Sequence, residues 1–484
     1  MKKLNLLLIT ADQMRGDCIA ALGHPDISTP NLDMMVKNGV AFSSAFSATP
    51  TCIPARAALF TGLSQVGHGR VGYQDFVPWD YSTTLPGCLA AGGYHTHCAG
   101  KMHVWPPRSL MGFHSVDLHD SFLPHRNTGT AAHNWWGHVD DYGDWLRREL
   151  PYEPELGDSG VGCNAWVARP WPLPEYTHPT NWTVSRSLDF LRKRDPTKPF
   201  FLWTSFVAPH PPYLPPACYL DRYLSMPLTP PAVGSWAKEI GVEHPDPDCF
   251  EGRPSKEELH RMQAGYYGLI TQMDDQIGRL MRGLRDEGVL QNTVVLFTAD
   301  HGEMLGDHHM FRKSQPFAGS VSVPMLLWDP GNHLGLPLGT RCDHITELRD
   351  VLPTLLEAAG LPIPESIEGQ SLLGLLDGRT QGRTLLHGEH TNMTNALGSM
   401  QYIVTHRHKY VWYSQSGQEM LFDRQNDPQE LTDLAANPTY TEALAYHRTL
   451  LVTALTGRQE GYSDGTQLVV GQTPTHLLDF PKKN

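Results

Sequence analysis

The chain alternates short, almost continuously apolar runs with longer amphipathic stretches. The apolar runs predict five buried strands, at 4–10, 94–99, 200–207, 293–298 and 323–328. The stretches between them predict helices, at 31–37, 55–60, 183–193, 257–285 and 347–359. Buried strands separated by helices are typical of a large, mostly parallel sheet flanked by helices on both faces. We therefore predict an α/β fold whose ligands bind beyond the carboxyl ends of the strands.

After residue 370 the pattern changes, and short strands replace the long helices. Pro362 and Pro364 interrupt the helical stretch that comes before this point. Beyond them the sequence predicts antiparallel strands joined by tight turns and then one helix, at 400–405, 409–412, 419–422 and 440–455. We expect a large α/β domain over residues 1–370, and a small α+β domain with an irregular tail over residues 371–484.

The stretch 108–180 is rich in Trp, His, Pro and Gly and shows little periodicity. Long irregular segments in compact domains are often binding loops, so one interpretation is an insertion that faces a substrate. The alternative is a surface excursion whose aromatic rings are buried for packing alone. The sequence leaves both interpretations open.

Composition limits the classes of protein to which the chain can belong. Its 484 residues, 40% hydrophobic and 18% charged, are enough to bury a large core and give no sign of general disorder. The net charge of −13 argues against nucleic acid or an anionic membrane as a partner. The first apolar run, 4–9, is too short to span a bilayer and lacks a signal-peptide cleavage site. The eight scattered cysteines include no CxxC pair, so we expect buried free thiols and a cytoplasmic protein.

Polar residues stand directly after two of the predicted strands. Asp12 and Gln13 follow the first strand, and Asp300 and His301 follow the strand at 293–298. If the two strands are neighbours, their ends bring together oxygen ligands and one imidazole, a set that suits a hard divalent cation. We expect calcium, with magnesium and manganese as alternatives. Either pair alone would be more typical of a turn or a helix cap.

The segment Cys52-Ile53-Pro54-Ala55-Arg56 lies at the start of a predicted short helix. Pro54 suits the first helical turn, so Cys52 should lie just outside the amino end. There the free N–H groups and the helix dipole favour negative charge, and Arg56 can reach back towards the same anion. A cysteine in this position would have a lowered pKa, so a reactive thiol is one interpretation of Cys52.

Cys-x-Pro-x-Arg before a Thr-Gly pair resembles the signature of the formylglycine-dependent, type I sulfatases, whose fold is alkaline phosphatase-like. The family usually has Ser at the fourth position, where this chain has Ala55. Further segments resemble other family elements, in the family's order: Gly100-Lys101-Met102-His103, Ala208-Pro209-His210-Pro211-Pro212, Asp300 to His308 with Lys313, Asp350 to Thr354, and Leu421-Phe422-Asp423. The likeness runs from residue 4 to about residue 435.

The resemblance implies a sulfuric ester hydrolase of the arylsulfatase type. A formylglycine-generating enzyme would be its partner during maturation, and would oxidise Cys52 to an aldehyde whose hydrate attacks sulfur. One divalent metal would act as a Lewis acid, held by Asp12, Gln13, Asp300 and His301. The charge on the sulfate oxygens would be balanced by Arg56, Lys101 and Lys313.

The family's proton-transfer roles map onto four residues of this chain. Asp300 would be the base for the formylglycine hydrate, and His103 would assist the elimination that releases sulfate. His210 and Lys313 would face the leaving oxygen as acid, and the sequence does not decide between these two.

Three other functions remain open at this point. A phosphonate monoester or phosphodiester hydrolase of the same superfamily has a similar metal set, but the cationic Lys101 and His103 suit a terminal sulfate better. A choline-sulfate hydrolase shares the Gly-Lys-Met-His element, although its usual carboxyl-terminal region is not found. The complete polar set disfavours a non-catalytic homologue that binds metal but never receives formylglycine. We expect a small sulfated sugar or an aryl sulfate as substrate.

Overall fold

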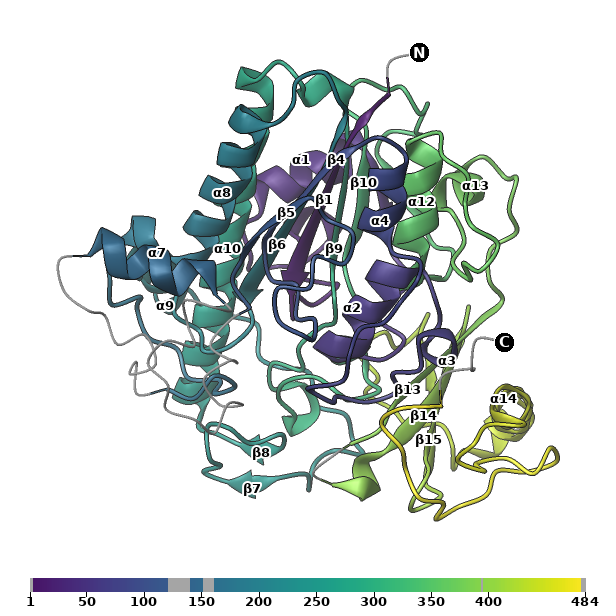
Figure 1. Cartoon of the computed structure of the whole chain (residues 1–484). Helices are drawn as coiled ribbons and strands as arrows, with labels where there is room; N and C mark the ends of the chain where they lie inside the picture. The colour runs from purple at the N-terminus through teal and green to yellow at the C-terminus, as the bar shows by residue number, and fades with distance from the viewer. Residues whose placement is uncertain (1–2, 121–139, 151–160, 393–394, 480–484) are drawn as a thin grey trace.

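The computed structural model describes residues 3–120, 140–150, 161–392 and 395–479 of the chain. Its main feature is an eight-stranded sheet with the order β11–β2–β10–β9–β1–β6–β4–β5 (Figure 1). These strands are β1 (Asn5–Asp12), β2 (Val40–Phe42), β4 (His95–Gly100), β5 (Ser115–Leu118), β6 (Phe200–Pro209), β9 (Thr293–Ala299), β10 (Met325–Trp328) and β11 (Thr340–Cys342). Among them only β10 runs antiparallel to its neighbours. The predicted mostly parallel α/β sheet is therefore confirmed.

The central strands are buried because their sequences are apolar on both faces. Every residue of β1 is buried, and β1 pairs in parallel with β6 on one side and with β9 on the other. The five predicted strands correspond to β1, β4, β6, β9 and β10. The short strands β2, β5 and β11 have no predicted counterpart, because three or four residues carry too little pattern to be recognised.

Helices cover both faces of the sheet (Figure 1). One side carries α1 (Pro30–Asn38), α8 (Pro179–Lys193), α9 (Ala217–Leu224) and α10 (Lys256–Asp286). The other side carries α2 (Cys52–Thr61), α4 (Leu85–Ala91), α12 (Val351–Ala358) and α13 (Leu372–Leu376). α10 begins after Ser255, whose hydroxyl accepts the Glu258 N–H while the Glu258 carboxylate accepts the Ser255 N–H.

The predicted helix at 347–359 is shorter in the structure. A 3-10 turn, Leu348–Asp350, precedes α12, because the Asp350 carboxylate accepts the N–H groups of Glu347 and Gln370 and so fixes the turn. Two pairs of short strands lie outside the main sheet, β3 (Ala45–Phe46) with β12 (Thr346–Glu347), and β7 (Val242–Glu243) with β8 (Gly252–Arg253).

A second, antiparallel sheet follows near the end of the chain. It consists of β13 (Leu385–His390), β14 (Met400–Thr405), β15 (His408–Tyr413) and β16 (Glu419–Asp423), and α14 (Thr441–Leu455) packs on it. Side chains alternate along β14, so Ile403 faces α14 while Tyr402 faces the core that contains Phe46 and Phe317. The small antiparallel sheet is therefore confirmed. The domain boundary near residue 370 stays a prediction.

Strand β13 has no predicted counterpart, and its buried polar residues explain why. Glu389 is fully buried, although a glutamate in a short strand is typical of a solvent-facing position. The Arg458 guanidinium donates to both Glu389 carboxylate oxygens at 2.9 Å, which compensates the buried charge.

The aromatic-rich stretch 108–180 lies partly outside the described residues, at 121–139 and 151–160. Its described part contains β5, helix α7 (Asp141–Glu149) and a 3-10 turn (Glu175–Thr177), and is more regular than its sequence suggests. The substrate-facing role of this stretch stays a prediction.

All eight cysteines are free thiols, as expected. The prediction that they are buried is wrong for three of them, because Cys218 is exposed and Cys88 and Cys249 are half-buried. Within the described ranges, each helix is either too short or too polar to cross a bilayer.

Candidate active site

Cys52 is the first residue of α2. Thr51 has an extended backbone and is the N-cap, and Gly62, at φ 67°, ends the helix. The prediction that Cys52 lies just outside the helix is therefore wrong by one position. Pro54 occupies the third helical position, where its missing N–H costs no intrahelical bond, so the helix can begin earlier. The thiol is still at the amino end of the helix, and Cys52 is 1% exposed.

Asp12 and Asp300 lie side by side at the carboxyl ends of neighbouring strands. β1 and β9 pair with Ala11 opposite Ala299, and the Asp300 N–H donates to the Ala11 carbonyl at 3.2 Å. One side-chain ligand atom from each of four buried residues lies within 4.8 Å of the other three: Asp12, Cys52, Asp300 and His301. The structure thus brings the two strand ends and the start of α2 to one point.

These four groups have the chemistry of a cation site. The His301 Nδ1–H donates to the Gly302 carbonyl at 3.0 Å, so Nε2 faces the cluster, 3.2 Å from Cys52 Sγ and 3.6 Å from one oxygen of each carboxylate. Burial and the charge of Asp12 raise the pKa of Asp300. Two carboxylates and an imidazole nitrogen are ligands that a divalent cation takes, so this donor set fits one metal ion.

Gln13 contacts this cluster through its backbone. Its N–H donates to Asp300 Oδ1 at 3.0 Å, from a left-handed backbone with φ 69°. Its side-chain amide donates to Glu303 and accepts from Lys313 Nζ at 2.7 Å. The structure therefore brings Gln13 to the site, while its role as a metal ligand stays a prediction.

The Arg56 guanidinium is fully buried beside Asp300. Nε donates to Asp300 Oδ2 at 3.0 Å, and Nη1 donates to the Lys101 carbonyl at 2.8 Å and to Ser205 Oγ at 3.1 Å. Nη2 is buried and has no hydrogen-bond partner among the described residues. Arg56 therefore fixes a carboxylate with one part of its fork and keeps one nitrogen free for a negative group.

Lys101 reaches the same point through a close backbone contact. Gly100 has φ 106°, and a Cβ at this residue would lie 1.8 Å from the Ser205 carbonyl oxygen, so only glycine fits there. The buried Lys101 Nζ forms an ion pair with Asp12 and lies 3.8 Å from Cys52 Sγ. The ammonium group therefore lies beside both Cys52 and one carboxylate.

His103 has a left-handed backbone with φ 57°, held by the Asp120 carboxylate, which accepts the N–H groups of Met102 and His103 at 2.7 and 2.9 Å. Its Nε2 lies 3.7 Å from Asp75 Oδ1. Burial opposes a charged ring, but contacts with Asp75 and Cys52 prevail and raise the pKa of His103. His103 therefore lies next to Cys52, as expected.

Lys313 and His210 form a hydrogen-bonded pair. His210 Nδ1–H donates to the Pro211 carbonyl at 2.6 Å, because a carbonyl oxygen can only accept. The other nitrogen, Nε2, then accepts from Lys313 Nζ at 2.8 Å. Burial, and after it the charge of Lys313, lowers the pKa of His210 to about 3. The histidine is therefore neutral, and the lysine carries the proton of this pair.

Positive charge gathers around Cys52 although the whole chain has a net charge of −13. Burial and the Asp12 carboxylate disfavour a thiolate, but Lys101, Lys313 and His301 outweigh them and hold the pKa of Cys52 well below its usual value. The site thus stabilises negative charge at residue 52, as an anionic substrate requires.

The structure adds supporting residues that the sequence argument did not assign. The Glu303 carboxylate accepts the N–H groups of Leu305 and Arg312 and the side-chain amide of Gln13. The sequence feature that could have predicted this role is the position of Glu303, three residues after Asp300. Asp75 and Asp120 support His103 from loops, and no local pattern marks either of them.

Comparisons with known proteins agree with this geometry. Residues 4–361 match the family described as "Sulfatase", and residues 306–454 match "N-sulphoglucosamine sulphohydrolase, C-terminal". The chain is 47% identical to an arylsulfatase of Clostridium perfringens (strain 13 / Type A), covering 97% of this chain and 98% of that protein. It is 30% identical to a multifunctional alkaline phosphatase superfamily protein of Trinickia caryophylli, covering 91% and 93%.

Among solved structures, a phosphonate monoester hydrolase of Agrobacterium radiobacter superposes with a TM-score of 0.74. The two sequences are 27% identical, and the match covers 93% of this chain and 95% of that one. The relatives thus match nearly the whole length of the chain, including both sheets.

Proposed function

The chain belongs to the sulfatase family and is a hydrolase of sulfate esters, and from this premise we propose that its nucleophile is a formylglycine made from Cys52. One observation carries the proposal. Cys52 lies at a helix amino end, beside two buried carboxylates, His301 and the Lys101 ammonium. A modifying enzyme that converts the side chain to an aldehyde would turn this residue into a hydrated, two-hydroxyl nucleophile.

In the proposed reaction, one hydroxyl of the hydrated residue attacks sulfur, and the bond from sulfur to the alcohol oxygen breaks. Lys101, Lys313 and the free Nη2 of Arg56 balance the growing charge on the sulfate oxygens. The second hydroxyl then loses its proton to His103. The bond between the side-chain carbon of residue 52 and the sulfate oxygen breaks. Sulfate leaves, the aldehyde returns, and water hydrates it again.

A divalent cation held by Asp12, Asp300 and His301, with Gln13 beside them, would supply Lewis acidity to this site. We propose calcium, with magnesium and manganese as alternatives, because both carboxylates offer hard oxygen ligands. We propose Asp300 as the base for the hydrated residue, and the hydrogen bond from Arg56 Nε, which fixes the orientation of Asp300, supports this role.

We assign the acid that protonates the leaving alcohol to Lys313. The His210 proton is committed to the Pro211 carbonyl at 2.6 Å, and His210 Nε2 faces Lys313 as an acceptor. Lys313 is therefore the proton donor of this pair, and His210 orients its ammonium group.

A second candidate function is that of a phosphonate monoester hydrolase, which the superposition on the Agrobacterium enzyme favours. The position of Lys101 argues against it. An ammonium group fixed by Asp12 suits a terminal group with three free oxygens better than a diester with a second substituent. We therefore propose sulfate monoesters as the main substrates, in the form of a small sulfated sugar or an aryl sulfate. The scattered thiols support a cytoplasmic enzyme that acts on a small substrate.

Mass spectrometry of the peptide that contains Cys52 tests the nucleophile. We expect the mass of formylglycine in active protein, together with turnover of 4-nitrophenyl sulfate, and loss of that turnover in Cys52→Ala. Cys342→Ala is the matched control, because it removes another buried thiol from an edge strand away from the site. An unmodified thiol in fully active protein would overturn the proposal. Parallel assays with glucosamine 6-sulfate, choline sulfate and a phenylphosphonate monoester define the substrate class.

A further inference from the structure

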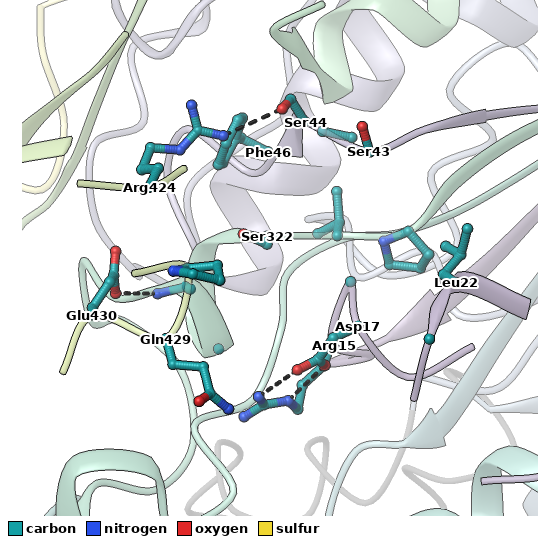
Figure 2. A pocket seen from close by; sticks show the side chains of 18 of the residues that line it. Arg15, Asp17, Leu22, Ser43, Ser44, Phe46, Ser322, Arg424, Gln429 and Glu430 are labelled. Carbon is teal, nitrogen blue, oxygen red and sulfur yellow. Dashed lines mark hydrogen bonds and ion pairs between the residues drawn. The ribbon is translucent and has the colours of Figure 1, made fainter. Parts of the chain in front are cut away.

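A cavity of about 730 Å³ lies where the small sheet meets the large one, apart from the candidate active site (Figure 2). None of the ten candidate site residues lines it. Its walls come from the segment after β1, from the segment that joins β2 and β3, and from the turns that follow β14 and β16. The volume is within the usual range for sites that hold small organic ligands.

The carboxylates in the wall of this cavity are already paired. Arg15 binds Asp17 and Asp307, each at 2.7 Å, and Figure 2 shows the first of these pairs. Lys409 binds Glu430, and the remaining carboxylate, Asp343, lies 3.4 Å from His406. Asp17, Asp307 and Glu430 therefore have cationic partners of their own, and Asp343 contacts a histidine ring.

Two arginines in the same wall lack such a partner. Arg424 donates to the carbonyls of Thr405 and His406 at 2.6 and 3.3 Å and to Ser44 Oγ at 3.3 Å, and its guanidinium lies over the Phe46 ring. Arg341 donates to the Ala21 carbonyl. In the described part of the chain, no carboxylate lies within ion-pair distance of either guanidinium.

The charge on Arg424 is incompletely compensated. Burial lowers the pKa of Arg424 although Glu430 acts in the opposite direction. A half-buried guanidinium that is bonded only to carbonyls and a hydroxyl is stabilised when an oxyanion binds to it. The reason is that charge-assisted hydrogen bonds are about twice as strong as neutral ones. The Ser44 hydroxyl, also in the wall, accepts from Arg424 and can donate to the same anion, whereas the Ser43 hydroxyl donates to the Cys342 carbonyl at 3.2 Å.

We propose that this cavity binds a small organic oxyanion, held by Arg424 and Arg341 with the help of the Ser44 hydroxyl. Sulfate, phosphate and carboxylate groups all present two or more negatively charged oxygens, to which the fork of a guanidinium can donate in parallel. The site is distinct from the catalytic one, and its occupancy does not depend on modification of Cys52.

Isothermal titration of the full chain tests the site, with sodium sulfate, sodium phosphate and glucuronate as probes and glucose as the neutral control. We expect sulfate to bind at two places, the catalytic site and this cavity, and Arg424→Gln to remove the second event or weaken it at least about tenfold. Arg407→Gln is the matched control, because Arg407 lies near the same turn, is exposed and binds Asp423 instead of lining the cavity. The probe that binds most tightly identifies the class of oxyanion.

The Arg341→Gln variant carries the same test if Arg424→Gln fails to fold, since Arg341 is exposed on the edge strand β11. It should weaken the second event in the same direction. A single binding event for every anion in the unsubstituted chain would overturn the proposal. So would glucose binding with equal affinity, or variants at Arg424 and Arg341 that bind anions like Arg407→Gln.

Discussion

Replacing Arg56 by lysine separates the two roles that the structure gives to this side chain. The variant keeps a positive charge near Asp300 but loses the planar fork, which donates to Asp300, to the Lys101 carbonyl and to Ser205 at once. If Arg56 acts mainly by fixing Asp300, the change should affect metal binding before it affects substrate binding.

The expected loss of stability in Arg56→Lys follows from the hydrogen bonds that the variant loses. A lysine can satisfy one of the three acceptors. If it keeps Asp300, the Lys101 carbonyl is left without this donor at about 1–3 kcal/mol, while Ser205 Oγ keeps the hydrogen bond from Thr10 and loses one net hydrogen bond of about 0.5–1.5 kcal/mol. We therefore expect the free energy of unfolding to fall by roughly 2–4 kcal/mol. Residues that orient a metal ligand typically change metal affinity about 10–100-fold, and we expect a loss of this size in the metal-activation constant.

The assay compares urea unfolding with turnover of 4-nitrophenyl sulfate, measured after chelation and stepwise return of calcium. Arg383→Lys is the matched control, because Arg383 donates to both Asp350 oxygens at 2.5 Å, outside the active site. That variant should lose stability but keep its metal-activation constant. An Arg56→Lys enzyme with a raised KM and unchanged metal activation would refute the reasoning, since Arg56 would then act on sulfate directly.

Three further predictions concern the nucleophile, the acid and buried histidine. Cys52→Ala should lower kcat by about 10⁴–10⁶-fold and leave the circular dichroism spectrum unchanged; a variant that retains substantial turnover would contradict the assignment. Lys313→Ala should lose about 10²–10⁴-fold with an alkyl sulfate and much less with 4-nitrophenyl sulfate, whose phenolate needs no proton; equal losses would exclude an acid role. Burial lowers the pKa of His178 from 6.5 to about 3, so the unfolded chain binds one more proton between these values, and stability falls as the pH drops below 6.5. His178→Gln should reduce this slope by about 1.4 kcal/mol per pH unit, measured by urea unfolding at pH 7, 6 and 5, and an unchanged slope would contradict the buried neutral histidine.

The strands that hold the site could be predicted because each is long, apolar and followed by polar residues. β1 and β9 show this pattern, and their neighbouring positions bring Asp12 and Asp300 together. β13 shows the limit of such reasoning. Its Glu389 can be buried because Arg458, 69 residues later in the chain, donates to it. No local sequence pattern predicts a partner at that distance.

The supporting residues of the site also depend on partners that no local sequence pattern predicts. The left-handed backbone of His103 depends on Asp120, and the position of Asp300 depends on Arg56, whose other partners are Ser205 and the Lys101 carbonyl. The choice between His210 and Lys313 was open in the sequence, because both residue types can carry a proton. It rests on a single hydrogen bond from His210 to the Pro211 carbonyl.

The sequence by itself determined the longer strands and helices and the mostly parallel sheet, and it predicted the reactive residues, since apolar periodicity and residue chemistry are local properties of the chain. Only the tertiary structure decided which strand ends meet, which nitrogen of His210 carries a proton, and that a second polar cavity opens beside the small sheet. The meeting of the strand ends and the cavity depend on contacts between residues far apart in the chain, whereas the His210 proton depends on where the folded backbone places the Pro211 carbonyl. Burial makes these contacts decisive, because a charge without water must be met by whatever the fold places next to it.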